Sequence, residues 1–184
     1  MDRAPLPNRQ SIRLREFDYS QGGAYFVTIC TTRRLCLFGD VTDGEVRLSP
    51  VGQVARLRWQ DLPRHATGLT LDVWVVMPNH LHGIVVLPGS TVTGVPSANL
   101  LPGPKSGSLG ATIGGFKSAV SREIAANHLA QVRPLWQRNY YERVIRNDEE
   151  FDAIRKYIAD NPLHWDDDPN HPRLHSPATL NLRS

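Results

Sequence analysis

Cysteine is scarce in this chain of 184 residues: Cys30 and Cys36 are the only two, and they do not form a C-x-x-C pair. This usage argues against a disulfide scaffold or a zinc clasp and favours free thiols in a reducing compartment. Long hydrophobic runs are also missing, because the longest apolar stretches, 69–76 and 84–87, fall far short of the roughly 20 residues that span a bilayer. The N-terminus has no apolar signal region, so we expect a cytoplasmic protein without a membrane segment.

Composition is otherwise ordinary, with 40% hydrophobic and 21% charged residues, and it predicts one globular domain. The net charge of +3 does not by itself identify a nucleic-acid partner. Basic residues nevertheless gather near the N-terminus and after residue 132, where a polyanion could lie. They are Arg3, Arg9, Arg13, Arg15, Arg133, Arg138, Arg143, Arg146, Arg155 and Lys156. A solvated charged surface is the alternative explanation.

Two histidines, His80 and His82, stand one residue apart at the start of an apolar run. Side chains of a strand repeat every two residues, so both imidazoles face the same side if this segment is extended. Neutral imidazole binds divalent metals, and a same-face pair supplies two ligands while leaving positions for water or substrate. A solvated strand end beside the turn at 77–79 is the alternative, and spacing alone does not separate the two.

Hydrophobic periodicity predicts strands and helices in alternation. The expected strands are 24–31, 45–48, 69–76, 80–87 and a further extended segment within 136–145. The expected helices are 49–62, capped by Ser49 before Pro50, 108–128, and one that begins after Asn147 and stops at Pro162. This order fits the α+β class, as a ferredoxin-like antiparallel sheet covered by helices.

The same pattern divides the chain into parts. Residues 1–23 are expected to form a basic N-terminal arm, 24–165 a single domain, and 166–184 a loosely ordered tail. Gly, Ser and Pro interrupt 88–107, which we expect to be a mobile loop.

Tyr157 and Asn161 are four residues apart on the last expected helix and therefore share one face. A phenol and an amide oxygen so placed could put a nucleophile beside a metal ligand. The plainer alternative is a tyrosine packed at the rim of the core and an asparagine that ends a helix.

Taken together, several motifs resemble those of the single-tyrosine transposases that carry a His-hydrophobic-His (HUH) motif, and above all the REP-associated tyrosine transposases. The similar segments are MPNHLH at 77–82, WQRNYYERVIRN at 136–147 and YIADNP at 157–162, with GAYFVT at 23–28 and GFKS at 115–118. The resemblance runs from about residue 13 to about residue 165.

The resemblance implies a DNA strand transferase on the HUH nuclease fold that uses a divalent cation, Mg²⁺ or Mn²⁺, and no nucleotide cofactor. His80 and His82 match the metal ligands, Tyr157 matches the nucleophile, and Asn161 occupies the place of a third ligand. Attack by the phenol on a phosphodiester would give a covalent 5′-phosphotyrosine and a free 3′-hydroxyl. The expected substrate is single-stranded DNA with hairpins, such as REP-like palindromes, bound by a monomer or a homodimer.

Alternatives remain at this point. Tyr140 and Tyr141 are rival nucleophiles because they lie in a family motif, but neither has an amide one helical turn away. The chain could be a catalytically silent DNA-binding protein on the same fold, or a hydrolase that uses metal-bound water. Candidate phosphate contacts are Arg9, Arg13, Lys117, Arg122, Arg138 and Arg143.

Overall fold

The computed structural model describes residues 22–89 and 107–175. Residues 1–21 of the expected basic arm, which include Arg9 and Arg13, residues 90–106 of the expected loop, and residues 176–184 lie outside these ranges. Within them, no helix is long and apolar enough to cross a membrane.

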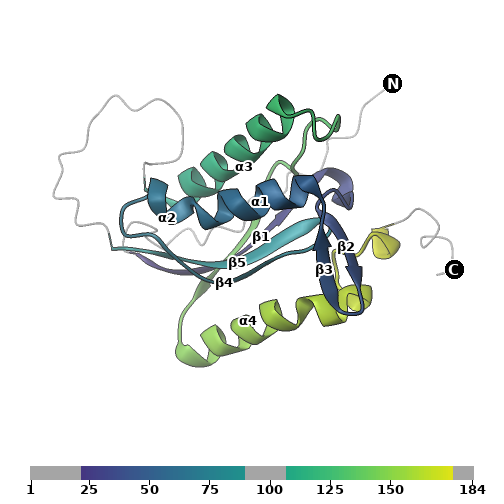
Figure 1. Cartoon of the computed structure of the whole chain (residues 1–184). Coiled ribbons are helices and arrows are strands. Elements are labelled where there is room, and N and C mark those ends of the chain that lie inside the picture. Colours follow the sequence, from purple (N-terminus) through teal and green to yellow (C-terminus); the bar gives the residue numbers. More distant parts are fainter. Residues whose placement is uncertain (1–21, 90–106, 176–184) are drawn as a thin grey trace, which may run out of the picture.

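Four strands form one sheet in the order β4-β5-β1-β6, and every neighbouring pair is antiparallel. Their bounds are Gly23–Cys30 for β1, Thr70–Val76 for β4, His80–Leu87 for β5 and Tyr141–Ile145 for β6. Helices cover both faces of this sheet (Figure 1): α1 (Pro50–Gln60) and α3 (Leu109–Ala126) lie on one side and α4 (Asp148–Asp160) on the other. The predicted α+β class with an antiparallel sheet is confirmed.

Side chains along the central strands alternate between the two faces of the sheet, and each face has its own hydrophobic cluster. The larger one lies under α1 and α3 and includes Tyr25, Ile29, Trp59, Leu81 and Phe116. The smaller one lies under α4 and consists of Phe26, Ile84, Ile145 and Ile158 with partly buried neighbours. Since β1 and β5 contribute to both, they are the buried centre of the sheet.

Gly83 on β5 allows α1 to sit close to the sheet. A Cβ atom at this position would lie 2.7 Å from Cζ2 of Trp59 and 3.1 Å from Cβ of Trp74. The fully buried Trp59 therefore packs directly on the β5 backbone. His82 precedes Gly83 and points to the opposite face. The packing of Trp59 against Gly83 therefore also holds in place the strand that carries the histidines.

Helix starts follow the predicted capping chemistry. The Ser49 hydroxyl accepts a hydrogen bond from the Gly52 amide, and Pro50 opens α1. The Asn147 side chain accepts from the Glu150 amide at 2.8 Å, and three acidic residues occupy the first turn of α4. The expected strand at 45–48 is present as β3 (Glu45–Leu48), and it forms a hairpin with β2 (Gly39–Thr42) through Asp43 and Gly44.

Several shorter elements complete the described chain. They are η1 (Thr32–Arg34), α2 (Leu62–His65), η2 (Asn161–Asp167) and η3 (Pro172–His175). Pro162 ends α4 as expected, but the chain continues in 3-10 geometry instead of leaving the domain.

The structure differs from expectation at residues 166–175, which the sequence assigns to a loose tail. Asp168 is 3% exposed and His171 is 7% exposed. Polar contacts hold this segment: Arg34 donates to the Pro169 carbonyl and the Asn79 amide donates to the Asn170 carbonyl, each at 2.8 Å. A polar sequence is normally solvated, and it is buried here because Arg34 after β1 and Asn79 before β5 offer partners for its polar groups.

Candidate metal centre and adjoining tyrosine

His80 and His82 lie on the α4 face of β5, as the two-residue repeat predicts. Their ring centroids are 4.4 Å apart, and the side chains are 0% and 2% exposed. Phe26 from β1 stacks on the His82 ring at 5.3 Å, and Trp165 from η2 lies 6.1 Å from the His80 ring. Two imidazoles are thus enclosed at one end of the sheet.

Each imidazole is fixed through its Nδ1 atom. His82 Nδ1 lies 2.8 Å from the hydroxyl of Thr28, which is its register partner on β1. His80 Nδ1 lies 2.8 Å from the amide oxygen of Asn79. Such contacts to the remote ring nitrogen orient metal-binding histidines, because they fix the ring and direct the other nitrogen at the metal.

Asp168 brings a carboxylate to the same place. One ligand atom from each of His80, His82 and Asp168 lies within 4.8 Å of the others, and all three residues are buried. The Asp168 Oδ2 atom is 3.9 Å from His80 Nε2 and accepts a hydrogen bond from the Asn161 amide nitrogen at 2.8 Å. These three groups could hold a metal ion, with Asn161 beside them.

Two atoms at this centre, His80 Nε2 and Asn161 Oδ1, have no hydrogen-bond partner among the described residues although both are buried. An unsatisfied buried polar atom costs about 1–3 kcal/mol. Both atoms are acceptors, and they adjoin an acceptor carboxylate. The Asn161 amide nitrogen donates to Asp168, and the remaining acceptors would be completed by a cation, so the residues fit a divalent metal.

Burial keeps both histidines uncharged. It lowers the pKa of His80 to about 3, with the positive charge of Arg34 acting in the same direction. It also holds the pKa of His82 well below its usual value, and the neighbouring His80 adds to the effect. Neutral imidazoles have the lone pair that metal binding requires.

Tyr157 stands at the edge of this centre. Its hydroxyl oxygen lies 3.3 Å from His82 Nε2, while the side chain remains 42% exposed. Burial raises the pKa of the phenol, and the negative charge of Asp168 raises it further, whereas a hydrogen bond from Asn161 lowers it. The hydroxyl is therefore protonated at neutral pH in the metal-free protein, and a cation nearby would favour its ionised form.

The rival tyrosines have different surroundings. Tyr141 is on the α4 face of β6, 48% exposed, with its ring 6.1 Å from that of Phe26. Its register partner Thr28 is also paired with His82, so one residue of β1 separates Tyr141 from the histidine in the sheet. Tyr140 packs against the core on the opposite face. Of these three tyrosines, Tyr157 is the one whose hydroxyl lies within hydrogen-bond distance of His82.

The candidate phosphate contacts do not share one environment. Lys117 is half-buried and donates to the Gln137 and Asn139 carbonyls at 2.8 and 3.0 Å, and burial lowers its pKa to about 8. Arg143 forms an ion pair with Glu150 at 2.5 Å. Arg122 and Arg138 are exposed, with Arg122 on α3, on the sheet face opposite α4.

Sequence reasoning missed Asp168, Asn79 and Thr28. Asn79 lies inside the motif that carries the histidines, so its position next to His80 could have marked it as a functional residue. Thr28 could be found only from the strand register, and Asp168 is the last of three aspartates in a segment that reads as solvated.

Comparison with known proteins adds independent findings. No family model matches the chain. An uncharacterised protein of Haemophilus influenzae is 33% identical over 172 residues, which cover 90% of this chain and 94% of that protein. A solved structure of a REP-associated tyrosine transposase bound to a REP hairpin aligns with a TM-score of 0.57. The chain belongs to the family of the Haemophilus protein and has the fold of a REP-associated tyrosine transposase.

The structural alignment covers 84% of this chain and 74% of the transposase at 20% sequence identity. A putative transposase of Deinococcus radiodurans aligns with a TM-score of 0.43 and 19% identity over 80% of this chain and 95% of its own. The predicted resemblance to the REP-associated tyrosine transposases holds at the level of the fold, on the alignment with a TM-score of 0.57.

Proposed function

We propose that this protein is a metal-dependent DNA strand transferase that nicks and rejoins single-stranded, hairpin-containing DNA through a covalent tyrosine intermediate. One observation carries the proposal: Tyr157 of α4 places its hydroxyl 3.3 Å from His82, beside the buried group of His80, His82 and Asp168. A nucleophile and a phosphate-neutralising site so close together are the two parts that phosphodiester transfer requires.

His80, His82 and Asp168 would hold the ion, and the amide oxygen of Asn161 is available as a further ligand. Two imidazoles with oxygen ligands suit Mn²⁺, and Mg²⁺ is compatible with the oxygen share of the set. A bound divalent ion would neutralise and orient the scissile phosphate. These residues would hold that ion on the α4 face of the sheet, and Tyr157 is partly open to solvent, where a strand can approach.

The transfer step is balanced within the two reactants. The phenolic oxygen of Tyr157 forms a bond to phosphorus, and the bond from phosphorus to the 3′-oxygen breaks. The phenol loses its proton, the released 3′-oxygen takes one up, and the phosphate stays on Tyr157 as a 5′-phosphodiester. Because one ester replaces another, a 3′-hydroxyl can reverse the step or complete transfer to a new end without a nucleotide cofactor.

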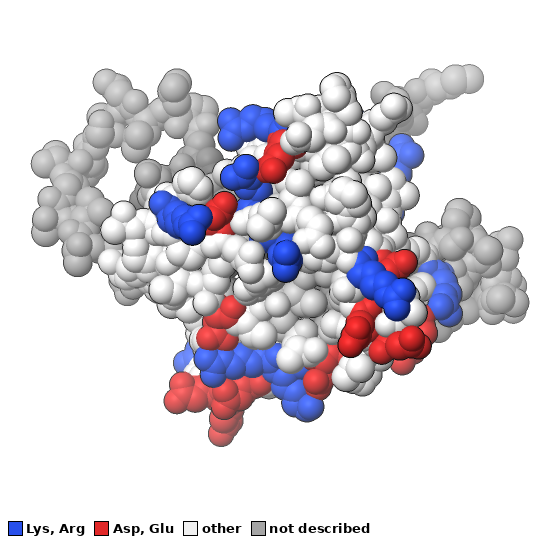
Figure 2. All heavy atoms as spheres, in the orientation of Figure 1, with Lys and Arg blue, Asp and Glu red and all other residues white. Residues whose placement is uncertain are grey.

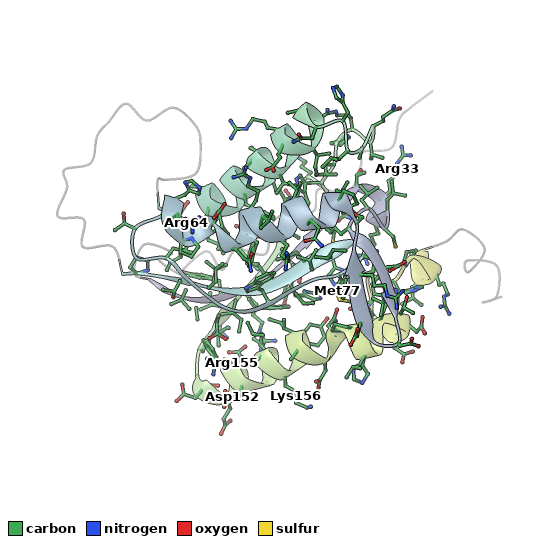
Figure 3. The ribbon with its side chains drawn as sticks, in the orientation of Figure 1. Arg33, Arg64, Met77, Asp152, Arg155 and Lys156 are labelled. Carbon is green, nitrogen blue, oxygen red and sulfur yellow. The ribbon has the colours of Figure 1, made fainter. Side chains whose placement is uncertain are left out.

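Single-stranded hairpin DNA is the proposed substrate because a protein of the same fold has been solved with a REP hairpin. The outer side of α4 does not favour a polyanion. Acidic and basic side chains alternate there (Figure 2), and Arg155 pairs with Asp72 while Lys156 pairs with Asp160. Asp152, Arg155 and Lys156 lie along this helix (Figure 3), so we expect the strand to enter elsewhere, past the exposed edge of Tyr157.

Trapping tests the proposal directly. A labelled hairpin oligonucleotide incubated with protein and Mn²⁺ is expected to give an adduct that survives denaturing electrophoresis and is absent in Tyr157→Phe. Tyr141→Phe is the matched control, since it removes a hydroxyl from the same face and should keep the adduct. An adduct that persists in Tyr157→Phe would assign the chemistry to another tyrosine.

Other outcomes would favour the alternatives. Hairpin binding without any adduct would support a catalytically silent DNA-binding protein. Cleavage without trapped protein, retained in Tyr157→Phe, would indicate a hydrolase that uses metal-bound water.

The arrangement also favours catalysis within one chain, because Tyr157 reaches the histidines of its own chain. Mixing Tyr157→Phe with His80→Ala protein is then expected to give no adduct. Recovery of the adduct in the mixture would show that the tyrosine serves a partner subunit.

A further inference from the structure

We propose that Asn79 is a positioning residue of the metal centre: its amide oxygen selects the His80 tautomer that can bind a metal, and its amide nitrogen holds the Asp168 segment over the centre. The proposal rests on the metal centre of the proposed function. Asn79 is completely buried and precedes the first histidine of the motif.

The orientation of the Asn79 amide is fixed by its partners. Its nitrogen donates to two backbone carbonyls, those of Arg34 at 3.0 Å and Asn170 at 2.8 Å. Carbonyls only accept, so the atom facing them must be the NH₂ group, and the other atom is the oxygen. The backbone is anchored as well, because the Asn79 carbonyl accepts hydrogen bonds from the amide and the hydroxyl of Thr31.

This orientation determines the tautomer of His80. The amide oxygen of Asn79 cannot donate, so His80 Nδ1, at 2.8 Å, must carry the ring proton. A neutral imidazole has one such proton, which leaves a lone pair on Nε2. That atom faces Asp168 and has no hydrogen-bond partner among the described residues. Asn79 therefore keeps His80 in its metal-binding form before any metal arrives.

The same amide reaches the C-terminal segment. Its contact with the Asn170 carbonyl lies two residues from Asp168, and Asp168 in turn accepts from the Asn170 amide through Oδ1. Arg34, whose carbonyl receives the other N–H of Asn79, donates to the Pro169 carbonyl. Asn79 thus joins three parts of the chain: the histidine strand, the turn after β1 and the segment that supplies the carboxylate.

Two substitutions separate the two contacts. Asn79→Ala removes both. Asn79→Asp keeps an acceptor for His80 Nδ1 but has no N–H for the Asn170 carbonyl. Asn127→Ala is the matched control, since the exposed Asn127 also donates its amide to a backbone carbonyl, that of Glu123, on the far helix α3. Circular dichroism and thermal unfolding establish which variants fold.

Three measurements test the effects of these substitutions. In metal-free protein, ¹⁵N NMR of the imidazoles is expected to show the Nδ1–H form of His80 in wild type and in Asn79→Asp, and a mixture in Asn79→Ala. Hydrogen exchange of residues 168–174 should be faster in both variants. Mn²⁺ affinity, measured by calorimetry, should fall about 10- to 100-fold in both, as it does for other outer-shell partners, and stay unchanged in Asn127→Ala.

The results separate this proposal from the proposed function. Wild-type protein that binds no Mn²⁺ would overturn the metal centre and the proposal with it. Equal Mn²⁺ affinity in wild type, Asn79→Ala and Asn79→Asp would overturn only the role of Asn79. Should Asn79→Ala fail to fold, Asn79→Asp decides alone, because unchanged exchange at 168–174 and unchanged affinity there would contradict the positioning role.

Discussion

The two faces of the sheet are built from the same strands and differ in nearly every other respect. Under α1 and α3, aromatic rings pack edge to face, with Trp59 and Phe116 at 5.1 Å, and nearly every buried side chain is apolar. Under α4, a small apolar cluster gives way to imidazoles, an amide and a carboxylate. Alternate residues of β5 face the two sides, so one strand contributes both to the apolar core and to the candidate metal site.

The largest effect should come from the core face. Phe116 lies 2% exposed between Trp59 and Trp136, and Phe116→Ala is expected to cost about 3–5 kcal/mol in unfolding free energy because it leaves a cavity. Urea unfolding measures this cost. Mn²⁺ affinity of the folded fraction should not change, and its loss would show that the two faces are not independent.

Metal addition probes the α4 face. A ligand at one hundred times its dissociation constant stabilises the folded state by about 2.7 kcal/mol, so Mn²⁺ should raise the unfolding temperature of wild type. His80→Ala removes one proposed ligand and should abolish the shift. Phe116→Ala should keep it. A shift that survives in His80→Ala would place the ion at another site.

Helix capping offers a smaller effect on the same face. Asn147→Ala removes the side-chain acceptor at the start of α4, the helix that carries Tyr157, and should cost about 1 kcal/mol. Chemical denaturation measures the loss. Ser108→Ala, which removes the corresponding contact to Ala111 at the start of α3, is the matched control. Of the two, only Asn147→Ala is expected to slow adduct formation, and equal slowing in both would contradict this difference.

The smallest effect concerns Lys117, because solvent reaches this partly exposed amine and weakens its contribution to the free energy of unfolding. Its pKa of about 8 in the folded protein is below the usual value of 10.5, as burial disfavours the charged form. Between these pH values the unfolded chain binds the proton and the folded chain does not, so stability conferred by this residue rises with pH. The unfolding free energy of wild type, relative to that of Lys117→Met, should therefore increase from pH 8 to pH 10. A flat or falling difference would contradict the shifted pKa.

Local patterns predicted much of this architecture. The strands 24–31 and 80–87, the caps Ser49 and Asn147, and the same-face placement of His80 and His82 all follow from side-chain periodicity and capping chemistry. These features depend on neighbours a few residues away, which a sequence displays directly.

Features that depend on distant partners did not emerge from the sequence. Asp168 looks solvated in the sequence. The 3-10 segment before it, which no periodicity reveals, brings its carboxylate to Asn161 and the histidines. Lys117 looks like a free cation because its two carbonyl partners lie about twenty residues along the chain. The double hydrogen bond from Asn79 requires the turn after β1 and the C-terminal segment to meet, which is a property of the whole fold.

The central claim is that a divalent cation binds between His80 and His82, beside Tyr157. Pulsed electron paramagnetic resonance of the Mn²⁺-loaded protein tests it most directly, because bound imidazole nitrogens couple to the metal spin. We expect coupling to two imidazole nitrogens in wild type and to one in His82→Ala. A Mn²⁺ spectrum without nitrogen coupling, or one that His82→Ala leaves unchanged, would contradict the claim.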